Sequence, residues 1–174
     1  AYIASTQRDL IAGEVSKDLT KRVLLPEKIV KAHKEGMIHF HDMDYFIQPI
    51  FNCCLINIGD MLDNGTVMNG KLIESPKSFQ VACTVMTQII SSVASSQYGG
   101  QSVNVAHLGK YLRKSRDKFM AETQEKFKDT LSREDIEKIV EMRVDDELRS
   151  GVQTIQYQIN TLMTTNGQSP FVTL

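Results

Sequence analysis

The chain has 174 residues, of which 41% are hydrophobic and 24% are charged, a composition typical of a single globular domain with a substantial core. The net charge of −1 provides no general surface for polyanions, so nucleic acid is not expected as a partner. The lack of an apolar run of about 18 residues argues against a membrane span. The three cysteines, an odd number, argue against a secreted disulfide framework, so a cytoplasmic location is expected.

The first part of the chain is predicted to be helical. Apolar residues recur at helical spacing from Thr6 to Val23. A second helix is expected to begin at Pro26, because proline suits the first position of a helix, and Gly36 is expected to end it. These helices lead into the segment from His39 to Leu62, which holds two of the four histidines and two of the three cysteines.

From Phe51 the sequence Phe-Asn-Cys-Cys-Leu-Ile-Asn-Ile has the composition of a strand. Strand side chains alternate between two faces, so Cys53 and Leu55 are expected on one face and Cys54 on the other. The two cysteines therefore cannot line the same pocket. Beyond the strand, two Asn-Gly dipeptides bracket Thr66-Val67-Met68 and predict a small hairpin or a tight loop.

The longest clear helix is predicted from Pro76 to Gln97. One side carries an apolar stripe, and the other carries uncharged polar residues, because no Asp, Glu, Lys or Arg occurs from Ser78 to Gly109. Solvated helix faces normally carry charge, so this neutral face is expected to pack on another helix, for which a second subunit is one source. The next stretch, Tyr98 to Ser102, contains two glycines and is expected to be a loop.

The rest of the chain is predicted to contain helices and a final strand. Residues 103–128 are mostly polar and charged, with a thin apolar seam. A strong helix is expected from Ser132 to Leu162, and Ser132 with Asp135 resembles a capping box. The chain closes on a strand-like segment without a following turn, and it opens on Ala rather than Met. These two features suggest a piece of a longer protein.

The histidine-rich stretch His39-Phe40-His41-Asp42 resembles part of a metal site, since two histidines two residues apart can reach one ion. Such a site needs further ligands, and the remaining histidines, His33 and His107, are not in a ligand-like cluster, so no metal is expected. Two interpretations stay open. The first is a hydrogen-bonded His–Asp pair that shapes a turn, and the second is a histidine that serves an active site as proton donor or orienting group.

The cysteines also allow two interpretations. Cysteines in an apolar strand are commonly small buried hydrophobic residues, whereas a thiol that faces a pocket can be redox active. Periodicity alone does not choose between these roles for Cys53 and Cys54. Cys83 lies on the apolar side of the long helix and is expected in the core.

Six stretches are distinctive in combination: STQRDLIAGEVSKD (5–18), HFHDMDY (39–45), FNCCLINIGDML (51–62), PKS (76–78), QYGGQS (97–102) and NTLMTTNGQSPFVT (160–173). Together, and in this order, they resemble the anaerobic (class III) ribonucleoside-triphosphate reductases, which are glycyl radical enzymes. The resemblance extends over nearly the whole chain. It implies a helix-rich α/β fold in which residues 1–174 form a single segment, the early part of a ten-stranded α/β barrel.

The resemblance also implies a reaction, the replacement of the ribose 2′-hydroxyl of ribonucleoside triphosphates by hydrogen. A glycyl radical, generated by an S-adenosylmethionine iron–sulfur activase, oxidises a loop cysteine that abstracts the 3′-hydrogen. A second cysteine, on the first barrel strand, faces the substrate and takes part in the reduction, and Cys53 matches it. Asn52 and His41 match residues near that active site. Either formate or a small redox protein would donate the electrons.

A regulatory site is implied as well. Members of the family bind a deoxynucleotide or ATP effector at a homodimer interface made of helices. Glu74, Lys77 and Gln88 match this effector site, and the helix 76–97 would form the dimer contact. The loop Asn166-Gly167-Gln168 matches a segment that relays effector identity to the substrate pocket.

Several family features do not occur in residues 1–174. They are the radical cysteine of the loop, the glycyl radical segment, the CxxC pairs of a zinc site and the ATP-regulatory domain. The chain alone is therefore expected to be inactive. Two competing hypotheses are a non-catalytic helical dimerisation domain and a part of another glycyl radical enzyme, such as a lyase.

Overall fold

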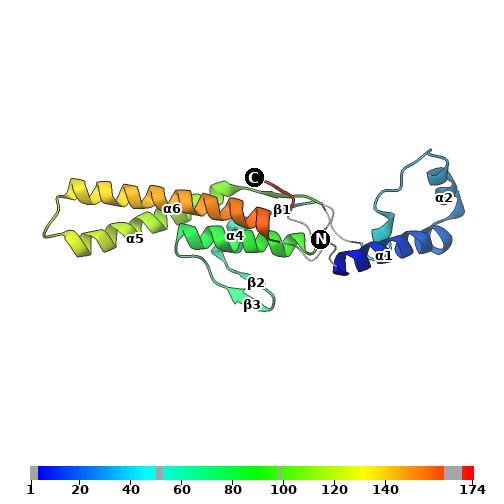
Figure 1. Cartoon of the computed structure of the whole chain (residues 1–174), viewed down its shortest axis with the longest axis horizontal. Coiled ribbons are helices and arrows are strands. Elements are labelled where there is room, and N and C mark those ends of the chain that lie inside the picture. Colours follow the sequence, from blue (N-terminus) through cyan, green and yellow to red (C-terminus); the bar gives the residue numbers. More distant parts are fainter. Residues whose placement is uncertain (1–3, 50–52, 98, 163–169) are drawn as a thin grey trace.

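The computed structural model describes residues 4–49, 53–97, 99–162 and 170–174 (Figure 1). Its elements, in chain order, are α1 (Ala4–Leu19), a π-helical turn (Thr20–Leu24), α2 (Glu27–Lys34), a 3-10 turn (Met43–Tyr45), β1 (Cys54–Ile56), α3 (Ile58–Asp63), β2 (Thr66–Met68), β3 (Lys71–Ile73), α4 (Phe79–Ala94), β4 (Gln101–Val103), a second 3-10 turn (Val105–Leu108), α5 (Gly109–Phe127), α6 (Arg133–Thr161) and β5 (Val172–Thr173). No helix of this described part is both long and apolar enough to cross a lipid bilayer.

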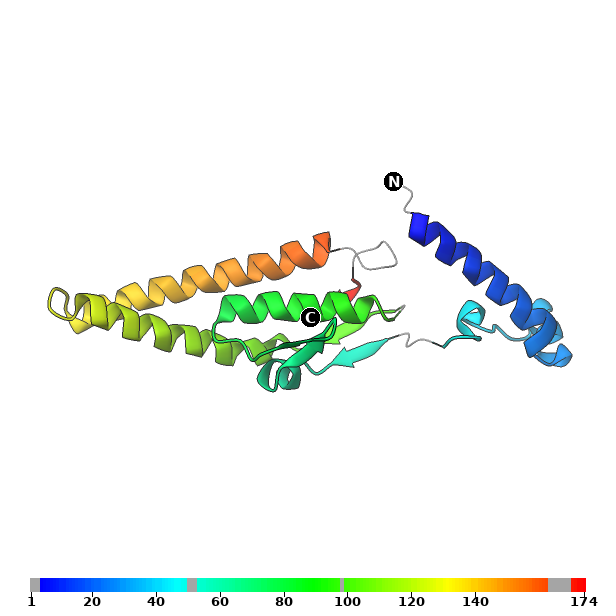
Figure 2. The same cartoon turned by 90° about the horizontal axis from the view of Figure 1, so that it is seen from below.

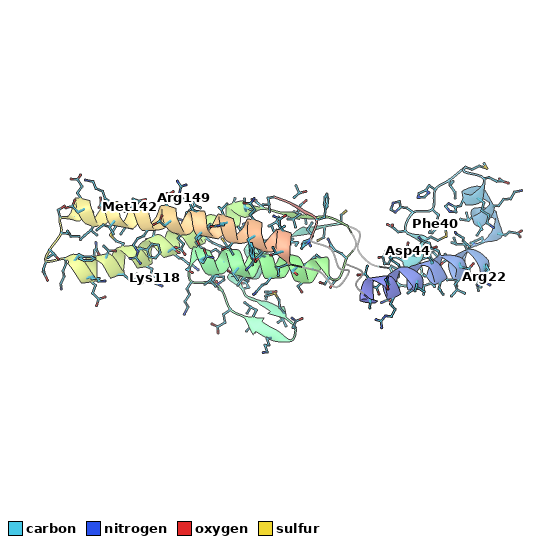
Figure 3. The ribbon with its side chains drawn as sticks, viewed as in Figure 1. Arg22, Phe40, Asp44, Lys118, Met142 and Arg149 are labelled. Carbon is cyan, nitrogen blue, oxygen red and sulfur yellow. The ribbon has the colours of Figure 1, made fainter. Side chains whose placement is uncertain are left out.

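The N-terminal helices α1 and α2 lie to one side of the other helices (Figure 1). Pro26 precedes α2 directly, and Gly36 follows it with a positive φ of 74°, so the predicted start and end of this helix are confirmed. The first 3-10 turn, which contains Asp44, folds back on α1 (Figure 3). There the Ser16 hydroxyl donates to the backbone carbonyl of Asp44. This contact joins segments 28 residues apart.

Helices α4, α5 and α6 form the main layer of the molecule (Figures 1 and 2). Ser78 caps α4 by accepting a hydrogen bond from the backbone N–H of Val81, and Ser132 caps α6 by accepting from the N–H of Asp135 at 3.1 Å. The predicted cap at Ser132 is therefore confirmed, and the Asp135 carboxylate accepts from the Ser132 hydroxyl at 2.6 Å, in place of the Ser132 backbone N–H that a capping box uses. Buried Gly151 allows α6 to approach α4 closely.

Three short parallel strands form a sheet in the order β1-β4-β5. Cys54 pairs with Gln101, and Leu55 pairs with Ser102. The prediction of a loop over Tyr98–Ser102 is wrong at its end, because Gln101 and Ser102 belong to the central strand. Gln, Ser and flanking glycines have little intrinsic preference for strands, so pairing with two neighbours, and not local propensity, determines this element.

The predicted hairpin is confirmed as β2 and β3, which pair in antiparallel register. Asn69 and Gly70 connect them with φ values of 52° and 75°. Two consecutive positive φ angles are typical of the type I′ turn, which Asn-Gly favours. The hairpin projects from the main layer (Figure 1).

Helix α3 was not predicted from the sequence. The strand expected from Phe51 is shorter than predicted, because α3 begins at Ile58. Asn57 caps this helix, since its side-chain oxygen accepts a hydrogen bond from the backbone N–H of Asp60 at 3.3 Å. The strand therefore ends at Ile56, and the capping Asn57 starts a helix within the same apolar stretch.

The hydrophobic core lies where the sheet, α3, α4 and the facing sides of α5 and α6 meet. Its fully buried members include Ile58, Leu62, Met86, Ile90 and Tyr111. The described part is thus a helix-rich α/β fold with a small parallel sheet, and it does not by itself form a ten-stranded barrel.

Candidate functional site

The two adjacent cysteines have different environments. Cys53 is exposed just before β1, whereas Cys54, the first residue of β1, is half-buried and packs against the core. The next two residues continue the alternation, since Leu55 is 78% exposed and Ile56 is buried. The predicted separation of Cys53 and Leu55 from Cys54 is therefore confirmed.

The exposed side of the sheet continues across all three strands. Ser102 and Thr173, which share a row with Leu55, are exposed, and Phe171 is 75% exposed. The opposite side faces α4 and the core. Parallel sheets are normally covered on both faces, so this open face, with Cys53 at its edge, is the candidate site of the chain.

Backbone hydrogen bonds hold the strand that follows Cys53. The N–H of Cys54 donates to the carbonyl of Gly100 at 3.1 Å, and the N–H of Gln101 donates to the carbonyl of Phe171 at 2.9 Å. At Gly100, a Cβ atom would stand 2.7 Å from Cδ1 of Phe171. The glycine thus makes room for the aromatic ring on the open face.

The third thiol, Cys83, belongs to the core as predicted. Burial raises the pKa of Cys83 to about 12, and the nearby Glu147 carboxylate adds to this effect. The thiolate is the reactive form of cysteine, so Cys83 is chemically inert at neutral pH. Among the three thiols, Cys53 is the one that solvent reaches freely.

His41 pairs with its neighbour Asp42, whose carboxylate lies 2.7 Å from Nδ1. Asp42 adopts a left-handed backbone conformation with φ of 50°, so the pair sits in a tight turn. The His41 side chain is 70% exposed. This arrangement agrees with the interpretation of a His–Asp pair that shapes a turn, and the imidazole remains accessible from solvent.

The histidines of this region lie in a row. The ring centroids of His33 and His39 are 5.7 Å apart, and those of His39 and His41 are 5.6 Å apart. His33 Nδ1 accepts a hydrogen bond from the backbone N–H of Phe40. Within the described ranges, no group of three or more His, Cys, Asp or Glu side chains is placed to hold a metal ion.

The residues that match the effector site are all exposed. Glu74 and Lys77 precede α4, and Gln88 lies on α4 itself. Gln88 lies nine positions after Phe79, a rise of about 14 Å along the helix axis. The three side chains are therefore spread along one end and one side of α4.

Two predicted site segments fall outside the described residues. They are Asn52, directly before Cys53, and the loop Asn166-Gly167-Gln168.

The neutral face of α4 packs against α6 of the same chain. Gln80 Nε2 donates to Thr154 Oγ1 at 2.8 Å, and the N–H of Gln80 donates to the Glu147 carboxylate at 3.0 Å. Thr87 is joined to Gln158 further along the same pair of helices. The expectation of a helical partner is confirmed within the chain, and the remaining exposed positions, Gln88 among them, are free for other contacts.

Two glutamines behind the candidate site were not among the residues predicted from the sequence. Gln97 is 5% exposed and Gln101 is 1% exposed. Gln97 Nε2 donates to the carbonyls of Gly99 and Gly100 at 3.2 and 3.3 Å, and Gln101 Nε2 donates to the carbonyl of Ile90 at 2.9 Å. In the sequence, a glutamine on each side of the Gly99-Gly100 pair was the pattern that could have indicated side chains bonded to the backbone there.

Comparison with known sequences places the chain in one family. The profile described as anaerobic ribonucleoside-triphosphate reductase matches residues 1–174. The protein of that name from Haemophilus influenzae is 40% identical over 176 residues, which cover 99% of this chain and 24% of that protein. The Salmonella typhimurium protein is 41% identical over 98% of the chain, and the Escherichia coli protein is 40% identical over 98%.

The chain spans about a quarter of the length of these curated relatives, which agrees with the expectation that it is a piece of a longer protein. The family match covers every stretch on which the resemblance rests, including the two cysteines and the residues before α4. The chain belongs to the anaerobic ribonucleoside-triphosphate reductase family.

Proposed function

We propose that this chain is part of an enzyme that reduces ribonucleoside triphosphates to deoxyribonucleoside triphosphates. Residues 1–174 supply the early part of its catalytic domain as a single segment, with β1, β4 and β5 as strands of a ten-stranded α/β barrel. The observation that carries the proposal is the position of Cys53, which is exposed at the open face of a parallel sheet while Cys54 and Cys83 turn to the core.

In this proposal the open face of the sheet lines the substrate pocket. Cys53 faces the ribose and takes part in the reduction, and Asn52 and His41 bind or orient the substrate beside it. In this proposal Asp42, whose carboxylate lies 2.7 Å from Nδ1, orients the exposed imidazole of His41 and leaves Nε2 for the pocket. A glycyl radical generated by a separate activase, and a zinc site, belong to the part of the protein outside these residues.

The effector site of the proposal lies along α4. Lys77, close to the N-terminal end of α4, provides positive charge for the phosphates of a deoxynucleotide or ATP, and the helix end adds a partial positive charge. Glu74 and Gln88 provide polar contacts further apart. A second subunit would complete the site on the exposed side of α4, and the loop Asn166-Gly167-Gln168 would connect it to the substrate pocket.

The competing hypothesis of a helical dimerisation domain has less support in this structure than in the sequence. It rested on an uncharged helix face that needed a partner, and α6 of the same chain already bonds to Gln80 on that face. The family match argues against another kind of glycyl radical enzyme.

The direct test is reduction of a ribonucleoside triphosphate by the full-length protein that carries this sequence, after anaerobic activation. Cys53→Ser is expected to abolish deoxynucleotide formation, because a hydroxyl does not replace the redox chemistry of a thiol. Cys54→Ser, the matched control next to it, is expected to retain activity. Full activity in Cys53→Ser would contradict the proposed role.

The effector site is tested in the 174-residue chain by calorimetric titration with dATP or dGTP, with molar mass measured by light scattering. Saturable binding to a dimer is expected, and Gln88→Ala should weaken it. Gln153→Ala, an exposed glutamine on α6, serves as the control. A monomer without nucleotide affinity would contradict an effector site built by α4 in this chain.

A further inference from the structure

Because Cys53 and Cys54 are neighbours, the register of β1 determines which of the two thiols faces the open side of the sheet. A shift of a strand by one residue moves every side chain to the other face of the sheet. In the observed register Cys54 and Ile56 face the core and Cys53 faces the open side. A one-residue shift would turn Cys53 and Leu55 inward and would present Cys54 instead.

Within β1 itself, side-chain burial does not choose between these two registers. Each of them buries one cysteine and one branched aliphatic residue, Cys54 with Ile56 or Cys53 with Leu55, so the apolar surface removed from water is nearly equal. The strand is also short, since β1 pairs with β4 over three residues. The selection therefore depends on interactions outside the side chains of β1, which include the burial of Ile58 in the following helix and the backbone hydrogen bonds of the strand.

The backbone anchor of the register is the carbonyl of Gly100. It accepts the N–H of Cys54 at 3.1 Å, the first hydrogen bond between β1 and the β4 segment. This carbonyl lies in a Gly99-Gly100 pair, and glycine backbones reach many conformations that other residues do not. Without a restraint, the peptide that carries the anchor could rotate away from β1.

The side chain of Gln97 provides that restraint. Its amide nitrogen donates to both the Gly99 and the Gly100 carbonyls, at 3.2 and 3.3 Å, and the residue is 5% exposed. The Gly100 oxygen thus receives Gln97 on one side and Cys54 on the other. Gln101, the partner of Cys54 in the register, is held separately by its bond to the Ile90 carbonyl of α4.

We propose that Gln97 is a positioning residue that fixes the register of β1 and thereby determines that Cys53, and not Cys54, faces the open side of the sheet. That Cys53 is the reacting thiol rests on the proposed function above. The selection of the exposed thiol by Gln97 does not, because it concerns only which side chain solvent reaches.

The test measures the reaction rate of each thiol in the 174-residue chain with a pyridyl disulfide, which modifies thiols over a wide pH range. Cys54→Ser reports the rate of Cys53, and Cys53→Ser reports that of Cys54. Buried Cys83 remains in both backgrounds and reports unfolding of the core. The quantity of interest is the ratio of the Cys53 rate to the Cys54 rate.

Gln97→Leu keeps the side-chain size and removes both hydrogen bonds. We expect the rate ratio to fall about tenfold, while Cys83 stays unreactive, since buried hydrogen bonds of this kind shift such equilibria by about that factor. Gln153→Leu on the surface of α6 is the matched control and should leave the ratio unchanged. An unchanged ratio in Gln97→Leu would overturn the proposal.

Gln97→Glu separates positioning from a general loss of structure. The introduced carboxylate cannot donate at about pH 8 and repels two carbonyl oxygens, whereas its protonated form at about pH 5 can donate again. We therefore expect the rate ratio to be low at the higher pH and to recover at the lower one. If both Gln97 variants expose Cys83 and no recovery occurs, the role is structural only and the proposal fails.

The outcome is distinguishable from failure of the proposed function. Full activity of Cys53→Ser in the full-length protein would reject Cys53 as the reacting thiol without changing the rate ratio. A fall in the ratio of the Cys53 rate to the Cys54 rate in Gln97→Leu would support the role of Gln97 in the register of β1, whatever the activity assay of Cys53→Ser shows.

Discussion

Cys83 lies on the side of α4 that faces α6, with none of its surface exposed. Burial raises the pKa of this thiol from the ordinary 9.0 to about 12. Its environment differs from those of Cys53 and Cys54, because Cys83 is shielded from solvent and lies near the Glu147 carboxylate, whereas Cys53 is exposed and Cys54 is half-buried. Cysteine is thus a buried core residue at position 83 in α4 and a candidate reactive group at position 53, directly before β1.

The raised pKa of Cys83 predicts a loss of stability at alkaline pH. The unfolded chain releases the thiol proton above about pH 9, whereas the folded chain retains it until about pH 12, so the free energy of unfolding falls between these values. By pH 10 the loss is on the order of 1 kcal/mol. Urea denaturation of the wild type and Cys83→Ala at pH 7 and pH 10 checks this, because the variant lacks the contribution. Equal losses in both proteins would contradict it.

Adding a single Cβ atom at Gly151 is expected to lower the stability of the chain. A Cβ atom at this position would overlap Phe79 and would stand 2.9 Å from Cys83 Sγ. Gly151→Ala is therefore expected to destabilise the chain by about 2 kcal/mol, although alanine favours exposed helices by about 1 kcal/mol over glycine. Ser150→Ala, the exposed neighbour on α6, should be neutral or slightly stabilising. Urea midpoints compare the two variants, and a stabilised Gly151→Ala would show that α4 and α6 can separate without cost.

Among the elements, the sequence predicted best those whose signals are local. Pro26 indicates where α2 begins, and the Ser132 cap indicates where α6 begins. The Asn69-Gly70 dipeptide indicates the turn between β2 and β3. Each of these signals acts within a few residues, through a fixed φ angle or a side-chain cap. No information from distant parts of the chain was needed.

The sequence predicted poorly what depends on distant partners. β4 appeared as a loop because its strand character comes from β1 and β5 on both sides. The role of Gln97 was not visible for the same reason, since its acceptors matter only through their contact with Cys54. The alternation of Cys53 and Cys54 was predictable, whereas the choice of the exposed face required the position of α4.

The contact between α4 and α6 predicts coupling between two side chains. Thr154→Val removes the acceptor of the Gln80 amide, which lies between the helices, and is expected to cost about 1 kcal/mol. Adding Gln80→Leu should recover part of that loss, because the unpaired donor is then gone as well. Thr161→Val, whose hydroxyl donates to the Tyr157 carbonyl within α6, is the control. Strictly additive losses in the double variant would argue against this coupling.

At the scale of the whole molecule, the described fold leaves much surface uncovered. The accessible surface is 11767 Å², whereas a compact monomer of 19.6 kDa exposes about 8,600 Å². The elongated arrangement of helices in Figures 1 and 2 contributes to this difference. So does the open face of the β1-β4-β5 sheet, where Leu55 and Phe171 are both more than two-thirds exposed. Such a surface suits a chain that is one part of a larger protein.

This open face is expected to bind an apolar fluorescent dye such as anilinonaphthalene sulfonate in the isolated 174-residue chain. Leu55→Ser combined with Phe171→Ser should lower the dye fluorescence by roughly half, because contiguous apolar surface binds such probes better than scattered residues do. Met142→Ser is the matched control, since Met142 is 66% exposed on α6, away from the sheet (Figure 3). Circular dichroism verifies that the variants stay folded. A control that lowers the fluorescence as much as the sheet variant would show that the dye does not report the open face.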